Sequence, residues 1–467
     1  MKRYIAWVIA VLGCLLGQTS TAQKILTAEE LRSIVRQYHP VAKQATIGVD
    51  MAKADITVAR GGFDPQLSVN SSRKTFDGID YYSHTSPELK IPTWYGIEVL
   101  AGTEYLRGSR TDPQETLGRT GFVGVSVPLL KNLLMDKRRA ALQQAKIFSQ
   151  LSEAARQTAL NDLQYEALAA YWKWAQYHQV YNVLQEVVSA NEKRLGLVKN
   201  AWRLGDRPAI DTTEALTQLQ QFEYLRNEAW LDFQNAGVEL SAFLWQADNQ
   251  PYLLPTDVRP DSNWQQTPML ASLIESEQVL IDLANANHPD LKQYNFKLAA
   301  LEVEKKLKFQ ELLPVLNLKY NQLGKGYDLA KTTVQPLFDN NFQFGVSFAV
   351  PLRLSQGRGE YRKAKLKILD TEYGLQNKRL LVQNKIKTYR NEALTLLQQI
   401  QLQQNALLNY QTLQRGEETR FFNGESSLFL VNSRETKKLE AQQKLIEVKA
   451  KFLKALASLQ WATGVLN

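Results

Sequence analysis

The chain of 467 residues is predicted to be mostly α-helical with a portion of β-strands, and to consist of two structural repeats. The repeat is visible in YHPVAKQ (38–44) and NHPDLKQ (287–293), which share His, Pro, Lys and Gln. The helices are predicted from two long segments of strong helix formers, and the strands from apolar alternation before each of them. Because related segments recur in the same order, we predict two diverged copies of one unit.

The two copies are expected at residues 23–246 and 276–467, with a linker at 247–275. Several Pro, Asn and Asp residues favour irregular structure in the linker. Each copy should begin with a helix that starts at a His-Pro pair, at 40–60 and 289–311, because proline suits the first turn of a helix. A second proline then ends each of these helices and leads into strand-type sequence.

Strand-type alternation is clearest at 342–350. The large apolar residues of this segment are Phe342, Phe344, Val346, Phe348 and Val350. Because successive residues of a strand point to opposite faces, these five should share one face, which we expect to be turned towards lipid. The segments 314–320 and 121–127 follow the same rule less regularly.

The longest helices are expected at 134–203 and 357–420, where Gly and Pro are few. At about 1.5 Å per residue they would span roughly 95–105 Å. Each should turn at a short loop, around Gly205 or Gly424, and return as a second helix. No single globular core surrounds helices of this length, so they should pack side by side, with polar faces towards solvent or a lumen.

The first 22 residues are predicted to be a removed export signal, with a basic pair at 2–3, an apolar stretch at 4–16 and small residues at 20–22. Cys14, the one cysteine of the sequence, lies within it, so the processed chain would carry no free thiol. The alternative is that Cys14, which follows Val-Leu-Gly, becomes the lipidated first residue of a lipoprotein.

Composition argues against several function classes. The net charge of +9 is spread over mixed acidic and basic residues, without the basic block that a nucleic-acid site needs. The four histidines lack the spacing of metal ligands, and no catalytic or metal-binding role is expected for His39 or His288. No nucleophile or acid–base pair stands in a recognisable setting, so we expect no enzymatic activity, metal or cofactor. The aromatic stretch YWKWAQY (171–177) is interpreted as packing between helices.

Two strands in each copy would give four strands per chain. A sheet of four strands has two open edges, whose backbone groups have no hydrogen-bond partners. Unpaired backbone groups are not tolerated inside a membrane, so we expect oligomerisation to close the sheet. Three chains would form a 12-stranded barrel with an apolar outer face. The first copy has extra residues between Pro65 and Pro128, interpreted as a longer loop with a short additional hairpin around 94–105.

Taken together, the order of motifs resembles that of TolC-like outer membrane efflux proteins over essentially the whole processed chain. Each copy has a His-Pro helix, a strand entered at proline, a GVSVPL-type strand end, a long helix and a glycine turn. The resemblance implies a homotrimer, in which a transmembrane 12-stranded β-barrel continues into a long periplasmic α-helical barrel. Its location would be the outer membrane of a Gram-negative bacterium, with contacts to outer membrane lipid and an extension into the periplasm.

The resemblance also implies a function and partners. The chain would be the passive outer membrane channel of a tripartite efflux or type I secretion system. It would dock onto a periplasmic adaptor (membrane fusion) protein and receive substrates from an inner-membrane pump of the RND, ABC or MFS type. The helical tips are the implied adaptor contacts: Arg203, Leu204 and Gly205 in the first copy, and Phe422, Asn423 and Gly424 in the second.

The resemblance further implies a periplasmic gate just beyond the two helix turns. Asp211 could focus cations in a ring of three carboxylates, or it could simply favour the first turn of its helix. Leu430 and Ser433 stand at the corresponding positions of the second copy, so the constriction would combine Asp211 with Leu430. Two other classes compete with a channel. A periplasmic coiled-coil adaptor or scaffold leaves the alternation at 342–350 unexplained, and an exported enzyme lacks a recognisable site.

Overall fold

The computed structural model describes residues 24–109, 111, 116–266, 268–327 and 340–466. The predicted export signal at 1–22, with Cys14, lies outside these residues. Within the described ranges, no helix combines the length and the apolar character needed to cross a membrane. The chain forms two compact units, here called the helical unit (1–43, 159–284 and 383–467) and the sheet unit (44–158 and 285–382). Each unit contains segments of both predicted repeats.

The main helices occur where the sequence predicts them. Two helices of 22 residues begin at the prolines of the His-Pro pairs, two helices of 67 and 68 residues follow the strands, and helices of 33 and 36 residues return. In chain order these are α3 (Pro40–Gly61), α4 (Lys137–Arg203), α5 (Ala209–Ser241), α7 (Pro289–Gln310), α9 (Ser355–Phe422) and α10 (Leu428–Thr463). Shorter helices are α2 (Ala28–Tyr38), α6 (Glu277–Asn287), η1 (Asn263–Gln265) and η2 (Ala271–Leu273).

The histidines of the two His-Pro pairs cap the helices that they precede. His288 Nδ1 accepts a hydrogen bond from the Asp290 backbone N–H at 3.2 Å, and His39 Nδ1 accepts one from Val41 at 3.2 Å. Both bonds satisfy backbone donors that a helix leaves unpaired in its first turn. The His-Pro pair therefore recurs where a helix begins, and its histidine ring accepts a hydrogen bond from a backbone N–H of the first turn.

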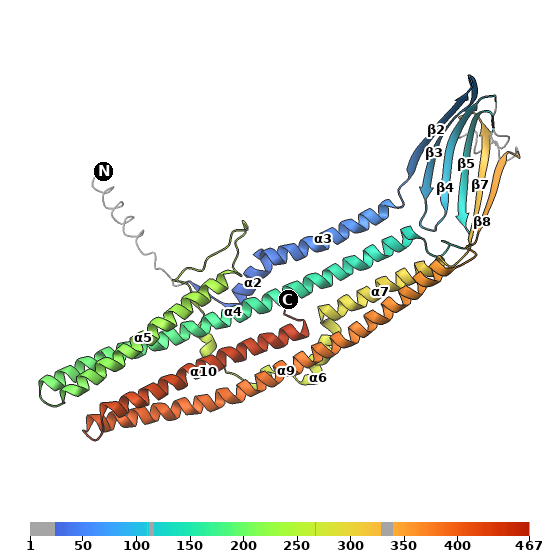
Figure 1. Ribbon diagram of the computed structural model, residues 1–467. Coiled ribbons are helices and arrows are strands. Elements are labelled where there is room, and N and C mark those ends of the chain that lie inside the picture. The colour runs from blue at the N-terminus through green and yellow to red at the C-terminus, as the bar shows by residue number, and fades with distance from the viewer. Residues whose placement is uncertain (1–23, 110, 112–115, 267, 328–339, 467) are drawn as a thin grey trace, which may run out of the picture. The chain divides into compact units, whose positions relative to one another are not determined.

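The sheet unit contains one antiparallel sheet in which neighbours in sequence are neighbours in space (Figure 1). Its order is β2 (Gln66–Phe76), β3 (Ile79–Pro92), β4 (Glu98–Arg107), β5 (Gly118–Pro128), β7 (Val315–Lys325) and β8 (Phe342–Ala349). The two edge strands are β2, dark blue in Figure 1, and β8, orange. The first predicted repeat supplies four of the six strands and the second supplies two.

This sheet corrects the predicted strand count. Four strands per chain were expected, but six are present, so a trimer of four-stranded chains with 12 strands no longer follows. The segment interpreted as a loop with a short hairpin around 94–105 forms two full strands, β3 and β4, of 14 and 10 residues. The pattern missed β3 because IDYYSHTSPELKIP mixes polar residues into both faces, and only pairing with neighbours shows its register.

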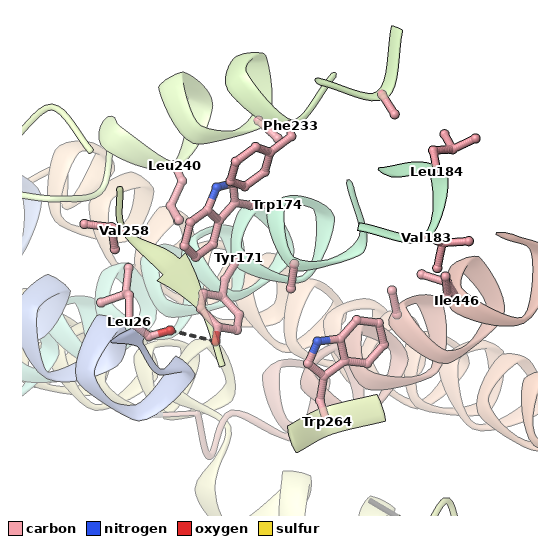
Figure 2. Packing of buried hydrophobic residues seen from close by; sticks show 14 of the residues in the cluster. Leu26, Tyr171, Trp174, Val183, Leu184, Phe233, Leu240, Val258, Trp264 and Ile446 are labelled. Atoms are coloured by element: carbon pink, nitrogen blue, oxygen red, sulfur yellow. Dashed lines mark hydrogen bonds between the residues drawn. The ribbon is translucent and has the colours of Figure 1, made fainter. Parts of the chain in front are cut away.

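The helical unit holds the main hydrophobic core, formed where α4 and α5 pack as one hairpin and α10 joins them. Tyr171 and Trp174 of α4 are buried at its centre beside Phe233 of α5, as Figure 2 shows. The Tyr171 hydroxyl donates to the Leu26 carbonyl at 2.9 Å, the dashed line in Figure 2. The packing interpretation of the aromatic stretch is thus confirmed for these two residues.

The same core fastens the start of the described chain to the linker. Leu26 belongs to β1 (Ile25–Leu26), which pairs in parallel with β6 (Arg259–Pro260) inside the predicted linker. Val258 and Trp264 of the linker are buried in the core (Figure 2). The linker is largely irregular, as predicted, but its apolar side chains make it part of the helical unit.

Candidate functional site

The turns at the ends of the two hairpins have the same backbone geometry. Gly205 and Gly424 have φ of +83° and +80°, in the left-handed region that favours glycine. At the first turn Gly205 N–H donates to Trp202 O and Asp206 N–H to Ala201 O. At the second turn the equivalent bonds run from Gly424 to Phe421 and from Glu425 to Arg420. Both are Schellman motifs, so each glycine acts as a helix cap.

The predicted adaptor contacts at these turns are exposed. Leu204 and Phe422 each expose 77% of their surface, and Arg203 and Asn423 are exposed as well. A large apolar side chain therefore stands in solvent one residue before Gly205 and two residues before Gly424. Neither the helix nor its cap requires such a side chain there, since helix ends are satisfied by backbone bonds. The structure offers two exposed apolar tips, one on each hairpin.

Asp211 lies in the first turn of α5, but it is not an isolated carboxylate. Its side chain is 16% exposed and stands 3.9 Å from Arg207, one helical turn earlier. Arg207 also donates to the Phe421 carbonyl at 2.7 Å and stacks over the Phe421 ring, with its Cζ 3.9 Å from the ring centroid. The cation beside Asp211 thereby ties the first hairpin to the second.

The other two predicted gate residues lie on α10. Leu430 and Ser433 are both exposed, and the Leu430 N–H donates to the Ser427 hydroxyl that caps the helix. Ser433 lines a groove between α5 and α10, together with Glu214 and Asn432, whereas Asp211 and Leu430 do not line it. Of the three predicted gate residues, this groove therefore contains Ser433 alone.

Glu214 is a carboxylate in this region that the sequence did not single out. Burial raises the pKa of Glu214, a hydrogen bond from Asn432 Nδ2 at 3.2 Å lowers it, and the Asp211 charge raises it. The net direction is upward, because partial removal from water disfavours the charged form. The sequence pattern D-x-x-E, one helical turn apart, could have indicated that these two carboxylates lie on the same face.

A buried polar link between α4 and α10 was also missed. Glu435 of α10 is almost fully buried and receives both ends of the Arg194 guanidinium from α4, Nη1 to Oε2 at 2.6 Å and Nη2 to Oε1 at 3.2 Å. Asn191 Nδ2 adds a third bond to Glu435 at 3.2 Å. A two-pronged contact of this kind is strong and directional. Its partners are far apart in sequence, so no local pattern predicts it.

No candidate metal site is present among the described residues. In that part of the chain, no group of three or more His, Cys, Asp or Glu side chains is placed to hold a metal ion. His178 is buried in the helical core, with its ring centroid 5.1 Å from that of Phe233. Burial, and secondarily the Arg259 charge, lowers the pKa of His178 to about 4. This histidine is neutral at ordinary pH and belongs to the packing.

The sheet carries the second candidate surface, which we call the apolar face. Directly opposed residues of antiparallel strands lie on one face. One row across all six strands consists of Leu67, Leu89, Ala101, Val123, Gln322 and Phe342. The next row on this face consists of Ile91, Val99, Val125, Tyr320 and Phe344. Val127, Leu318 and Val346 form a third row.

The opposite side of the sheet, the mixed face, carries polar and charged residues together with the buried apolar side chains of Leu100, Leu106 and Phe122. Glu88, Lys90 and Glu98 are on it, together with Asn321 and Gln343. The lipid-facing prediction for β8 remains a prediction, but its four strand residues do share the apolar face. Val350 is a correction: β8 ends at Ala349, before the proline at 351, so Val350 is not part of the strand.

Comparison with known proteins agrees with this architecture. Residues 280–465 match the family described as outer membrane efflux protein. The Campylobacter jejuni CmeC outer membrane channel is 15% identical, with 94% of this chain and 85% of that chain covered and a TM-score of 0.62. The Neisseria gonorrhoeae MtrE outer membrane channel in its open state is 14% identical, with 94% and 89% covered and a TM-score of 0.64.

CusC, a transmembrane channel protein, is 13% identical, with 96% of this chain and 95% of that chain covered and a TM-score of 0.66. No curated protein sequence matches the chain. The fold is thus that of solved outer membrane channels over nearly the whole chain, and the second predicted repeat matches the efflux protein family. The resemblance to outer membrane efflux proteins inferred from the sequence is confirmed.

Proposed function

We propose that this protein is the outer membrane channel of a tripartite efflux or type I secretion system. It conducts substrates passively from an inner-membrane pump across the periplasm and the outer membrane. The observation that supports this most is the apolar face, where Leu67, Phe344 and Val346 are more than half exposed although they lie in a regular sheet. An exposed apolar face backed by charged residues matches a lipid-facing barrel wall with a polar lumen.

The two sheet edges support an oligomer. β2 and β8 each pair with one neighbour only, so the outer side of each has no strand partner within the described sheet. In a membrane those backbone groups need partners, and pairing β8 of one chain with β2 of the next supplies them. A closed homotrimer is the arrangement that we propose. The matched lengths of α3 and α7, α4 and α9, and α5 and α10 support a tunnel built from two repeats per chain.

The periplasmic end is proposed to serve docking and gating. Leu204 and Phe422 supply apolar contacts for an adaptor protein, flanked by Arg203 and Asn423. The gate is proposed at Asp211, Leu430 and Ser433 of three chains. Arg207 would hold the gate closed, because it contacts both Asp211 and Phe421 and thereby joins the two hairpins.

Two measurements test the proposal, with a periplasmic adaptor or scaffold as the alternative. The full-length protein should fractionate with the outer membrane, and the purified protein should give stepwise ion conductance in planar lipid bilayers. Recovery as a soluble periplasmic protein without conductance would support the adaptor instead.

The gate has a separate test in the same bilayers. Asp211→Ala and Leu430→Ala should each raise conductance, because they remove a charge and a bulky side chain from the proposed constriction. Glu228→Ala, at an exposed position further along α5, is the matched control and should leave conductance unchanged. If both gate variants conduct like the unmodified protein, the constriction lies elsewhere.

A further inference from the structure

The hairpin formed by β3 and β4 distinguishes the first predicted repeat from the second, which has no equivalent in its two described strands. Its strands have 14 and 10 residues, and a strand of about 9–11 residues is long enough to cross a membrane. Both strands are inserted between β2 and β5 with backbone pairing on each side, interrupted by a register shift at Lys74/Thr75 and by a gap at Ser86 and Pro87 on the β4 side. The hairpin is therefore part of the sheet, not a loop attached to it.

Near its turn, the hairpin continues the apolar face of the neighbouring strands, although Leu100 of β4 is a buried apolar residue on the mixed face. Leu89, Ile91, Val99 and Ala101 continue the apolar rows, whereas Glu88, Lys90 and Glu98 lie on the mixed face. Alternation that agrees with both neighbouring strands indicates that the hairpin shares their environment on both faces.

The base of the hairpin is anchored on the mixed face and at the turn. On the mixed face Glu98 binds Lys90 at 2.7 Å and Arg138 of α4 at 3.0 Å. In the turn between the strands, the Trp94 ring stacks on Phe63 with 4.1 Å between centroids, and Tyr95 is 79% exposed. Exposed Trp and Tyr at one end of an apolar strand band are typical of the boundary between lipid and water.

We infer that the β3–β4 hairpin lies in the barrel wall, with Leu89, Ile91, Val99 and Ala101 against lipid acyl chains and Trp94 and Tyr95 at the periplasmic boundary. This inference rests on the proposed channel function. Each chain then contributes six strands, and three chains form an 18-stranded barrel instead of a 12-stranded one. Because barrel diameter grows roughly linearly with strand number, the lumen at the membrane is about 1.5 times wider.

The test places single cysteines on the apolar face of the sheet in the full chain, with Cys14→Ser so that no other thiol takes the label. Leu67→Cys, Leu89→Cys, Ala101→Cys and Val123→Cys lie on the apolar face of four successive strands, and Val346→Cys marks β8. Glu88→Cys, the neighbour of Leu89 on the mixed face, is the matched control. Each variant is labelled in detergent with a small fluorophore and reconstituted into vesicles of phosphatidylcholine with brominated acyl chains, which quench only probes in contact with lipid.

The expected result is quenching at Leu89 and Ala101 equal to that at Val346, and little quenching at Glu88. Quenching at Val346, Leu67 and Val123 but not at Leu89 or Ala101 would overturn the inference and leave a barrel of four strands per chain. Quenching at none of these positions would overturn the proposed channel function itself. Quenching at Glu88 as strong as at Leu89 would also contradict the inference, because the hairpin would then not separate lipid from lumen.

Discussion

Large apolar side chains have opposite environments in the two units. In the helical unit Trp174 exposes 1% of its surface, because Tyr171, Phe233 and the linker surround it. In the sheet unit Phe344 exposes 55% although its strand is regularly paired. Contact between apolar surface and water is unfavourable in both units. The chain itself covers Trp174, whereas Phe344 needs an apolar partner from outside the chain.

The largest expected effect tests the first half of this comparison. Trp174→Ala should destabilise the helical unit by about 3–5 kcal/mol, because it leaves a cavity in a packed core. Thermal unfolding of the detergent-solubilised protein, followed by circular dichroism, measures the loss. Phe344→Ala is the matched aromatic truncation on the sheet and should lower the unfolding midpoint much less. Equal losses would mean that the sheet side chain is packed as tightly as the core.

A charged interior contact in the helical unit should have a similar effect. Arg194→Ala is expected to cost about 3–5 kcal/mol, because it leaves the Glu435 carboxylate buried without its cation. Glu435→Gln together with Arg194→Ala should recover part of the loss, since no buried charge then remains. The same thermal measurement applies, with Lys193→Ala, an exposed neighbour, as the control. No change in the single variant would show that the pair contributes nothing to the contact between α4 and α10.

A charge on the sheet sharpens the second half of the comparison. Phe344→Arg should cost about 2–4 kcal/mol in lipid, the effect of Arg or Lys at the midplane on the outer face of a barrel. Gln343→Arg, one residue earlier on the mixed face, should be tolerated. The yield of folded protein in outer membranes and in reconstituted vesicles compares the two variants. Similar yields would indicate that the apolar face does not meet lipid.

The smallest effect concerns pH and the buried histidine. The folded-state pKa of His178 is about 4, below its usual value of 6.5, so the unfolded chain binds a proton more readily. Stability is therefore lost as pH falls from about 6.5 towards 4, and the loss is complete below the folded pKa. His178→Phe should flatten this part of the dependence of the unfolding midpoint on pH. An unchanged profile would show that other groups control the acid sensitivity of the core.

Local patterns were sufficient for much of the fold. The His-Pro helices, the long helices, their glycine turns and the alternation of β8 all follow from residues close together in sequence. Only part of the candidate site could be predicted from local patterns. The tips at Leu204 and Phe422 were found, but the Arg207 contacts that pair Asp211 and reach Phe421 were not. Those contacts join two hairpins, and a sequence pattern carries no information on which helices meet.

The sequence by itself determined the helices, the strand type and the resemblance to outer membrane efflux proteins, because helical and strand periodicities are local properties of the chain. Only the tertiary structure decided that the sheet has six strands and that Glu435 is paired inside the helical unit. The physical reason is the same in both cases. The register of β3 is specified by the strands that pair with it. A charge can be buried only where a group of opposite charge, here far away in the sequence, lies beside it.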